Sequence, residues 1–303
     1  MSDKDTFKKE LEERTKEIEQ LIVKYLPEEK GHQKTIFEAV NYSVKAGGKR
    51  LRPMLMQETC RLFIGEVPEP VVPFMAAMEM IHTSSLVHDD LPCMDDDMMR
   101  RGKASTWAEF GEDIGVLAGD ALMMYAMETA AKAFDMTEDP DELIRIGHAM
   151  GILARKSGIY GMIGGQTVDV ELAGGAIARD KLDFIYRLKT GALIEASMLI
   201  GAILGGAADE DCKIVESLAS KIGMAFQIRD DILDVTGNEE TIGKPSGSDE
   251  KNQKTTYVTL DGLEKAKERV VRLSDEAVAD LDKLPGSNEF LEKLIRLLAG
   301  REK

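Results

Sequence analysis

The sequence predicts an all-α protein, and two observations carry that prediction. Apolar residues recur at spacings of three and four along almost the whole chain, which is the period of an amphipathic helix. Alternating runs of Val, Ile, Thr and aromatic residues, which are typical of β-strands, are absent from the sequence. At 303 residues the chain can bury a substantial core, and nothing in its composition forces a split. We therefore expect one helical domain over residues 1–303.

Helices are expected at about 5–26, 33–46, 53–63, 70–91, 105–134, 141–160, 179–207, 210–235, 260–283 and 288–300. The first lacks the apolar core of a secretion signal and is too acidic for a transit peptide, so it should be an exposed helix. Residues 191–208 approach the ~20 apolar residues that cross a bilayer. Glu195 and four glycines in that stretch indicate a buried helix of a soluble protein instead, with no membrane span. The longest irregular segment, residues 236–255, is expected to be functional or disordered.

The charge balance and the cysteines narrow the class of protein. The chain has 39 basic and 55 acidic residues, a net charge of −16. This charge would repel nucleic acid and the anionic face of a membrane, so neither is an expected partner. Cys60, Cys93 and Cys212 are too few and too scattered for a disulfide framework or a zinc site. We therefore expect a cytoplasmic protein.

An acidic cluster, HDDLPCMDDD, occupies residues 88–97 at the end of the apolar helix predicted over 70–91. Adjacent carboxylates repel one another, and the C-terminal end of a helix is already negative, so a cation is expected here. Asp89 and Asp95 would diverge on an unbroken helix that turns by about 100° per residue. Pro92 breaks the helix, which allows Asp95 to fold back beside Asp89. Taken alone, the cluster could also be a solvated acidic turn.

A second acidic cluster lies in FQIRDDILDVTG, residues 226–237. Asp230 and Asp234 are one turn apart on one face of a helix, and Gln227 lies on the turn before. Oxygen ligands without clustered His or Cys indicate Mg²⁺, which typically binds one or two carboxylates, substrate phosphates and water. Two such helix ends facing each other would hold a diphosphate between metal ions.

Basic residues complete the pattern. In AGGKRLRP, residues 46–53, Lys49 and Arg52 flank a helix N-terminus that opens with Pro53, which is a suitable site for an anion. Arg100 and Arg101 directly follow the first acidic cluster, and arginine suits bidentate contact with phosphate. Each could be an ordinary surface cation when taken alone. Together with the two acidic clusters they imply two separate diphosphates.

From about residue 45 to 256 these motifs occur in the order of a known family. They are GGKRLRP, DDLPCMD with a two-residue insertion and a trailing RRGK, LAGDAL, GGQTVD, KTGALI and FQIRDDILD. With this combination the chain resembles the trans-type polyprenyl diphosphate synthases, and the insertion resembles bacterial farnesyl and plant-type geranylgeranyl synthases. The resemblance implies an all-helical homodimer with a deep apolar pocket beneath the metal ions. It also implies condensation of isopentenyl diphosphate with an allylic diphosphate (dimethylallyl, geranyl or farnesyl) and release of diphosphate.

The resemblance implies a role for each motif residue. Mg²⁺, three ions per active site with substrate bound, would be held by Asp89 and Asp95 and by Asp230, with Asp90, Asp231 and Asp234 completing the two metal motifs. The allylic diphosphate would be bound by Arg100, Lys189, Lys244 and Lys254, and isopentenyl diphosphate, without metal, by Lys49, Arg52, His82 and Arg101. Lys189, Thr190 and Gln227 would be catalytic, because Thr190, Gln227 and a carbonyl freed by a helix break near Gly191 could face the allylic cation. Lys244 and Lys254 fall on the irregular segment, which could close over the diphosphate and exclude water.

Product length depends on what closes the pocket below the first acidic cluster. Farnesyl synthases of this family usually carry an aromatic residue five positions before the first Asp, and some carry one at four. Here those positions are Ser84 and Ser85, roughly 6–8 Å down the helix from Asp89. Ile81 and Met78 are the next candidates for a floor, although an aromatic from another helix or from the partner subunit could close the pocket instead. The serines therefore favour a C20 product, geranylgeranyl diphosphate, with C15 farnesyl diphosphate as the alternative.

The sequence departs from the family pattern in two places, and two other functions compete with a synthase. Ala104 and Trp107 stand near a proline and a His that the family commonly has after RRGK, and we expect this to affect local packing and the entry to the following helix. A His often found before KTG is also missing, with Arg187 and Leu188 in its place. A class I terpene cyclase would not need the second, metal-free group of basic residues. A catalytically silent subunit of another synthase is disfavoured because both acidic motifs are intact.

Overall fold

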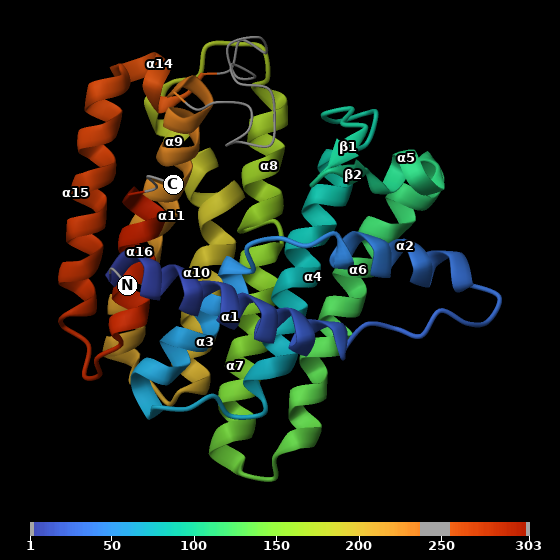
Figure 1. Cartoon of the computed structure of the whole chain (residues 1–303), viewed down its shortest axis with the longest axis horizontal. Coiled ribbons are helices and arrows are strands. Elements are labelled where there is room, and N and C mark those ends of the chain that lie inside the picture. Colours follow the sequence, from blue (N-terminus) through green and yellow to red (C-terminus); the bar gives the residue numbers. More distant parts are fainter. Residues whose placement is uncertain (1–2, 237–254, 301–303) are drawn as a thin grey trace. The chain divides into compact units, whose positions relative to one another are not determined.

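The computed structural model describes residues 3–236 and 255–300, and within these ranges the chain is almost entirely helical (Figure 1). The helices are α1 (Asp3–Val23), α2 (Lys34–Lys45), α3 (Leu51–Ile64), α4 (Val71–Asp89), α5 (Thr106–Phe110), α6 (Glu112–Ala131), η1 (Lys132–Met136), α7 (Pro140–Ser157), α8 (Met162–Glu171), α9 (Arg179–Ile185), η2 (Tyr186–Gly191), α10 (Ala192–Leu204), α11 (Asp209–Thr236), α14 (Tyr257–Asp261), α15 (Leu263–Leu281) and α16 (Glu289–Gly300). Strands β1 (Met99–Arg100) and β2 (Lys103–Ala104) form a short antiparallel hairpin. The predicted all-α class is confirmed.

The chain divides into two compact units, which are described separately. The first comprises Met1–Gln57 and Val67–Met150, and the second comprises Glu58–Glu66 and Gly151–Lys303. Helices α3 and α7 therefore contribute residues to both units. The first acidic motif and the basic turn belong to the first unit, whereas the second acidic motif belongs to the second.

In the first unit, α4 and α6 pack side by side (Figure 1). Helix α4 is buried over most of its circumference because apolar residues occupy nearly all of its faces. At its C-terminal end, His88 fits against α6 because Gly119 has no side chain; a Cβ there would lie 2.0 Å from His88 Nε2. The same nitrogen lies 3.1 Å from the carbonyl oxygen of Val116. This close packing fixes the end of α4, where the first acidic motif begins.

In the second unit, α11 is the central helix and packs against α10, α15 and η2. Its buried face joins a core cluster with α9, η2, α14 and α15; the buried members are Ile177, Leu182, Ile185, Tyr186, Ala225, Ile228, Ile232, Tyr257, Ala266, Val270 and Leu273. The apolar face of α11 is thus committed to packing. The carboxylates of α11 lie on its remaining faces and at the ends of that core.

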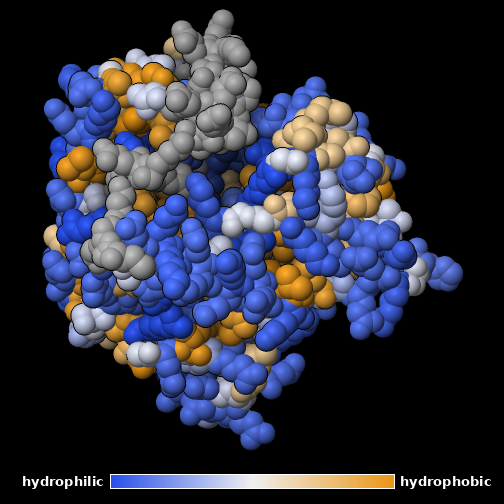
Figure 2. Space-filling model, viewed as in Figure 1, coloured by the Kyte–Doolittle hydropathy of each residue, from blue (hydrophilic) through white to orange (hydrophobic). Residues whose placement is uncertain are grey.

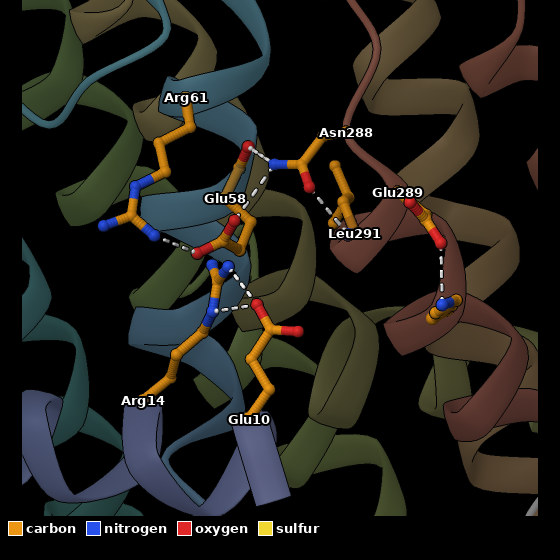
Figure 3. A network of polar contacts seen from close by, with 8 residues as sticks. Glu10, Arg14, Glu58, Arg61, Asn288, Glu289 and Leu291 are labelled. Atoms are coloured by element: carbon orange, nitrogen blue, oxygen red, sulfur yellow. Dashed lines mark hydrogen bonds and ion pairs between the residues drawn. The ribbon is translucent and has the colours of Figure 1, made fainter. Parts of the chain in front are cut away.

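A polar network joins α3 to α16 within the second unit (Figure 3). The Asn288 amide nitrogen donates to the carbonyl oxygen and to Oε2 of Glu58, both at 3.0 Å, while Arg61 donates to Glu58 Oε1 at 2.8 Å. The Leu291 N–H donates to Asn288 Oδ1 at 3.0 Å, which satisfies one of the first amides of α16. The buried Glu58 carboxylate is therefore paired, as a charge in an apolar interior must be.

Several predicted helices are divided in the structure. The helix expected over 105–134 consists of α5, α6 and η1, because Gly111 adopts φ +96° and interrupts the helix. The helix expected over 179–207 is interrupted by the π-turn η2, which confirms the predicted break near Gly191. Helix α8, helix α14 and the β1–β2 hairpin were not predicted.

Among the helices of the described ranges, none combines the length and the apolar character that crossing a membrane requires. The most apolar, α10, has only 13 residues and carries the buried Glu195. The Lys156 ammonium donates to Glu195 Oε2 at 2.5 Å and to Glu216 Oε1 at 3.0 Å. The Glu195 carboxylate, which indicates a buried helix and not a membrane span, is thus paired with Lys156 inside the second unit.

Candidate active site

The first acidic motif folds back on itself after α4 ends. The Asp95 N–H donates to the Asp89 carbonyl oxygen at 2.8 Å, and the Asp97 N–H donates to the Asp90 carbonyl oxygen at 3.1 Å. Asp96 adopts φ +53°, in the left-handed region that asparagine and aspartate tolerate better than most residues. The predicted return of Asp95 to Asp89 is confirmed.

Arg100 of β1 braces this returning loop. Its Nε donates to both carboxylate oxygens of Asp90, at 2.9 and 3.1 Å, and its Nη2 lies 3.2 Å from Asp97 Oδ2. Burial works against the charge of Arg100, but its hydrogen bond with Asp90 and the neighbouring negative charges outweigh that effect and raise its pKa. Asp90 itself is only 2% exposed. Its carboxylate is therefore turned towards Arg100 and the interior, unlike that of the partly exposed Asp89.

Trp107, one of the departures from the family pattern, also contacts the motif. Its indole Nε1 donates to the Asp97 carbonyl oxygen at 3.1 Å. Gly115 makes room for it, since a Cβ there would lie 2.8 Å from Trp107 Cβ. The sequence predicted a packing change here, but not that the tryptophan would hold the end of the acidic loop.

The β1–β2 hairpin joins the acidic loop to α5. The Tyr42 hydroxyl donates to the Ala104 carbonyl oxygen at 2.7 Å, and the Ser105 N–H donates to the Met98 carbonyl oxygen at 2.9 Å. The side chains of Met98 and Met99 are exposed, and Figure 2 shows apolar surface over the hairpin. The hairpin thereby presents Arg100 and Arg101 in succession from a fixed backbone.

The basic turn before α3 is built on unusual backbone angles. Gly47 and Gly48 adopt φ +89° and +141°, and Arg50 adopts +49°. A Cβ on Gly48 would lie 2.9 Å from the Arg101 guanidinium, which donates a close hydrogen bond to the Gly47 carbonyl oxygen. The two glycines therefore allow Arg101 to approach the turn that carries Lys49.

Arg50, which the sequence analysis did not single out, anchors this turn. It is 4% exposed and donates to Glu79 Oε1 and to the Val44 carbonyl oxygen, each at 2.7 Å; its Nε also lies 3.4 Å from Glu19 Oε1. These contacts tie the turn to α1, α2 and α4. Glu79 within the apolar α4 was the signal that could have identified a buried partner, because a charge there needs one.

His82 lies in a strongly positive environment. Burial lowers its pKa, and the charges of Arg52, Arg101, Arg50 and Arg100 lower it further, to well below its usual value. The imidazole is therefore neutral at neutral pH. Two of the charges that lower this pKa, Arg52 and Arg101, are also residues predicted to bind isopentenyl diphosphate, and Lys49 of the adjoining turn is exposed.

In the second unit, the π-turn η2 carries two of the three residues predicted to be catalytic, Lys189 and Thr190. The Lys189 ammonium donates to Asp169 Oδ2 of α8 at 2.6 Å, and the Thr190 hydroxyl donates to Gln227 Oε1 of α11 at 2.7 Å. Gly165 allows α8 to approach the turn, because a Cβ there would lie 2.2 Å from the Lys189 backbone nitrogen. Thr190 and Gln227 are brought together as predicted, and Lys189 has an acidic neighbour that was not predicted.

The second acidic motif divides its carboxylates between two environments. Asp230 is exposed and Asp234 is half-buried, one turn later on α11. Asp231 is 3% exposed, and its Oδ2 accepts hydrogen bonds from the Tyr186 hydroxyl at 2.7 Å and from the Tyr257 N–H at 3.1 Å. The adjacent Asp230 and Asp231 therefore face different surroundings.

The residues proposed to set product length lie inside the first unit. Met78, Ile81 and Ser84 have no exposed surface, and the Ser85 hydroxyl donates to the His82 carbonyl oxygen at 2.8 Å. A local hydrogen bond thus accounts for the Ser85 hydroxyl. The two remaining predicted residues, Lys244 and Lys254, lie outside the described residues.

The donor groups suit Mg²⁺ that is shared with a substrate. Within residues 3–236 and 255–300, no three His, Cys, Asp or Glu side chains gather closely enough to hold a metal ion by themselves. The carboxylates come instead in small sets at helix ends. This matches an ion that takes one or two carboxylates and completes its shell with phosphate oxygens and water.

Comparison with known proteins agrees with these motifs. A family model described as polyprenyl synthetase matches residues 33–286. The farnesyl diphosphate synthase of Geobacillus stearothermophilus is 39% identical over 292 residues, which cover 96% of this chain and 97% of that protein. The large subunit 1 of the heterodimeric geranylgeranyl pyrophosphate synthase of Arabidopsis thaliana is 45% identical over 80% of this chain. The matched segment spans 65% of that plant protein's length.

Solved structures give the same result. An apo FPP/GFPP synthase from Zymomonas mobilis aligns with a TM-score of 0.84 and 32% identity, covering 97% of this chain and 99% of that one. A geranyltransferase from Helicobacter pylori complexed with magnesium and isoprenyl diphosphate aligns with a TM-score of 0.81 and 31% identity, covering 98% and 97%. With the family model matched over most of its length, the chain belongs to the polyprenyl synthetase family.

Proposed function

We propose that this chain is a short-chain prenyltransferase that condenses isopentenyl diphosphate with allylic diphosphates, with Mg²⁺ as its cofactor. The observation that carries the proposal is the approach of Arg101 to the Gly47–Gly48 turn that carries Lys49, next to the returned Asp89–Asp95 loop. An anion site beside a site for divalent cations is what two diphosphates, only one of them bound to metal, require. The relatives named as farnesyl and geranylgeranyl synthases support the same chemistry.

The metal-binding side is formed by the outer carboxylates. Asp89 and Asp95 would hold Mg²⁺, as would Asp230 and Asp234, with three ions per active site when substrate is bound. When bound, the metal stabilises the negative charge that develops on the leaving diphosphate. The allylic diphosphate is also held by a basic set, which is Arg100, Lys189, Lys244 and Lys254.

The metal-free side binds isopentenyl diphosphate through Lys49, Arg52, His82 and Arg101. Because His82 is neutral, it can donate a hydrogen bond without adding to the repulsion among the arginines. Thr190 and Gln227 form the polar wall that faces the allylic cation. Their hydrogen bond holds the two side chains together at this wall.

The product is a C20 chain, geranylgeranyl diphosphate, because Ser84 is small and fully buried where an aromatic would block elongation. The test is to incubate purified protein with Mg²⁺, isopentenyl diphosphate and dimethylallyl or farnesyl diphosphate, and to identify the dephosphorylated alcohols. Geranylgeraniol is expected from the natural chain and farnesol from a Ser84→Phe variant. Farnesol as the end product of the natural chain would show that another wall closes the pocket. No elongation from any allylic starter by folded protein would refute the synthase and favour a silent subunit.

The enzyme is a homodimer that uses α6 as its contact surface. Val116, Leu117 and Met124 of α6 are exposed in the single chain, Met124 by 70%. Neighbouring exposed apolar side chains are typical of an interaction surface, which a second copy would cover. Light scattering on the natural chain and on Leu117→Glu tests this, with Val271→Glu, an exposed valine on α15, as control. A natural chain that is monomeric, or that needs a different subunit for activity, would contradict it.

A further inference from the structure

Asp231 differs from the other carboxylates of the second acidic motif in where it points. Two hydrogen bonds end on the same oxygen, Oδ2, one from the Tyr186 hydroxyl and one from the Tyr257 N–H. The side chain is almost fully buried, and the Tyr186 and Tyr257 rings pack together with centroids 5.5 Å apart. A buried carboxylate with such donors has its charge satisfied by the protein.

Tyr186 is the first residue of the π-turn η2. Such turns occur as isolated irregularities in helices, often at functional sites, and their backbone geometry needs support from the surrounding structure. This turn carries Lys189 and Thr190, and it ends at Gly191, which lies against Gly223 of α11; a Cβ on Gly223 would lie 2.8 Å from the Gly191 Cα. The geometry of the turn therefore fixes where the two polar side chains project.

One face of α11 supports the whole turn. Gly223, Gln227 and Asp231 are spaced by four residues, and they meet Gly191, Thr190 and Tyr186 respectively. Residues four apart share a helix face, whereas the next residue along, Asp230, is rotated by about 100°. Asp230 is exposed, so the two consecutive carboxylates serve different faces of the helix.

We propose that Asp231 is a positioning residue, which holds Tyr186 and thereby the π-turn that presents Lys189 and Thr190, and that it does not ligate Mg²⁺. The proposal rests on the proposed function, because it concerns the same reaction. It assigns metal binding in this motif to Asp230 and Asp234 alone. Tyr186, which belongs to none of the sequence motifs, takes part in the same positioning contact.

Three variants separate positioning from metal binding. In Asp231→Asn, the amide oxygen can still accept both hydrogen bonds, so the Mg²⁺ concentration for half-maximal rate should stay near that of the natural chain. Tyr186→Phe removes the hydroxyl alone; it should lower kcat per folded molecule about tenfold, as for one hydrogen bond to a charged group, and leave the Mg²⁺ dependence and the KM for isopentenyl diphosphate unchanged. The matched control Asp230→Asn should shift the Mg²⁺ dependence upward. Calorimetric titration of each variant with MgCl₂ in the presence of inorganic diphosphate should give the same ranking without catalysis.

Two results would overturn the proposal. One is an Asp231→Asn variant that weakens Mg²⁺ binding as much as Asp230→Asn does. The other is a Tyr186→Phe variant with full turnover per folded molecule, which would mean that the contact only stabilises the fold.

A metal-free experiment keeps this test separate from the proposed function. Unfolding of Tyr186→Phe, Asp231→Ala and the double variant in urea with EDTA measures the coupling of the two side chains directly. Adding the free-energy changes of the two single variants gives an expected unfolding equilibrium constant for the double variant. The measured constant should be about tenfold smaller than this, because the second substitution removes no further contact. Additive effects would refute the contact even if the chain elongates prenyl diphosphates. Coupling together with an inactive natural chain would refute the proposed function alone.

Discussion

Replacing Glu79 by leucine removes one half of a buried ion pair, and we expect it to destabilise the protein by about 3 kcal/mol. The side chains of Arg50 and Glu79 are 3% and 2% exposed and meet at 2.7 Å. Breaking a buried pair by removing one partner typically costs about 3–5 kcal/mol, because the other charge stays buried. The lower end applies here, since Glu19 lies 3.4 Å from the same guanidinium and is itself partly solvated.

The double variant Arg50→Met, Glu79→Leu should be more stable than Glu79→Leu alone. It leaves no buried charge unpaired, and a buried ion pair replaced by apolar residues of similar volume is often neutral for stability. The double variant still loses stability at the Val44 carbonyl oxygen, because its hydrogen bond from Arg50, 2.7 Å long, is removed. An unsatisfied buried acceptor costs about 1–3 kcal/mol. The order of stability is therefore natural chain, double variant, then Glu79→Leu.

Urea unfolding followed by tryptophan fluorescence measures this order. Trp107 is the one tryptophan of the sequence, and it lies in the same unit as the ion pair. A Glu79→Leu variant that loses less than about 1 kcal/mol, the range of an exposed pair, would refute the reasoning. So would a double variant that is as unstable as the single one. In addition, the double variant should have a raised KM for isopentenyl diphosphate despite its recovered stability, because Arg50 fixes the turn that presents Lys49 and Arg52.

Three further predictions concern the same unit. Trp107→Phe removes the donor to the Asp97 carbonyl oxygen and should raise the Mg²⁺ concentration for half-maximal rate severalfold, as expected for about 1 kcal/mol; an unchanged titration would remove the indole from the site. Gly48→Ala places a Cβ 2.9 Å from the Arg101 guanidinium and should raise the KM for isopentenyl diphosphate while leaving that for the allylic substrate unchanged; equal changes in both would contradict the assignment. The pKa of His82 in the folded chain lies below 6.5, the usual value for an unfolded chain. Below about pH 6.5 the unfolded chain therefore binds a proton at His82 that the folded chain does not. The free energy of unfolding should then fall as the pH drops, by up to about 1.4 kcal/mol per pH unit. His82→Gln should flatten that dependence in urea unfolding at pH 7.5, 6.5 and 5.5, and an identical slope would refute it.

The sequence predicted the regular helices because their apolar period is strong. The predicted spans 33–46, 70–91 and 210–235 agree with α2, α4 and α11 to within two residues at either end. The return of Asp95 to Asp89 also followed from local chemistry, since Pro92 must end the helix. These features depend on neighbours in the sequence, which a single chain reveals.

The missed features depend on contacts between distant segments. Helix α8 contains MIGGQTV, whose glycines lower helix propensity, but Gly165 is needed where α8 meets the π-turn. The role of Trp107 required knowing that Gly115 leaves room for it and that the Asp97 carbonyl oxygen faces it. No periodicity encodes such pairings, so the sequence could mark the tryptophan as unusual but could not give it a partner.

The paired aspartates of the two motifs follow a common geometric rule. Consecutive residues on a helix point about 100° apart, so only one carboxylate of a DD pair can face a bound cation while the helix packs on a core. In both pairs the second member turns inward: Asp90 to Arg100, and Asp231 to Tyr186. Each inward carboxylate thereby holds a segment that carries residues proposed to bind substrate. In the proposed reaction, the groups that would stabilise the leaving diphosphate are thus already held in place by the protein, which would lower the reorganisation that ionisation of the allylic bond requires.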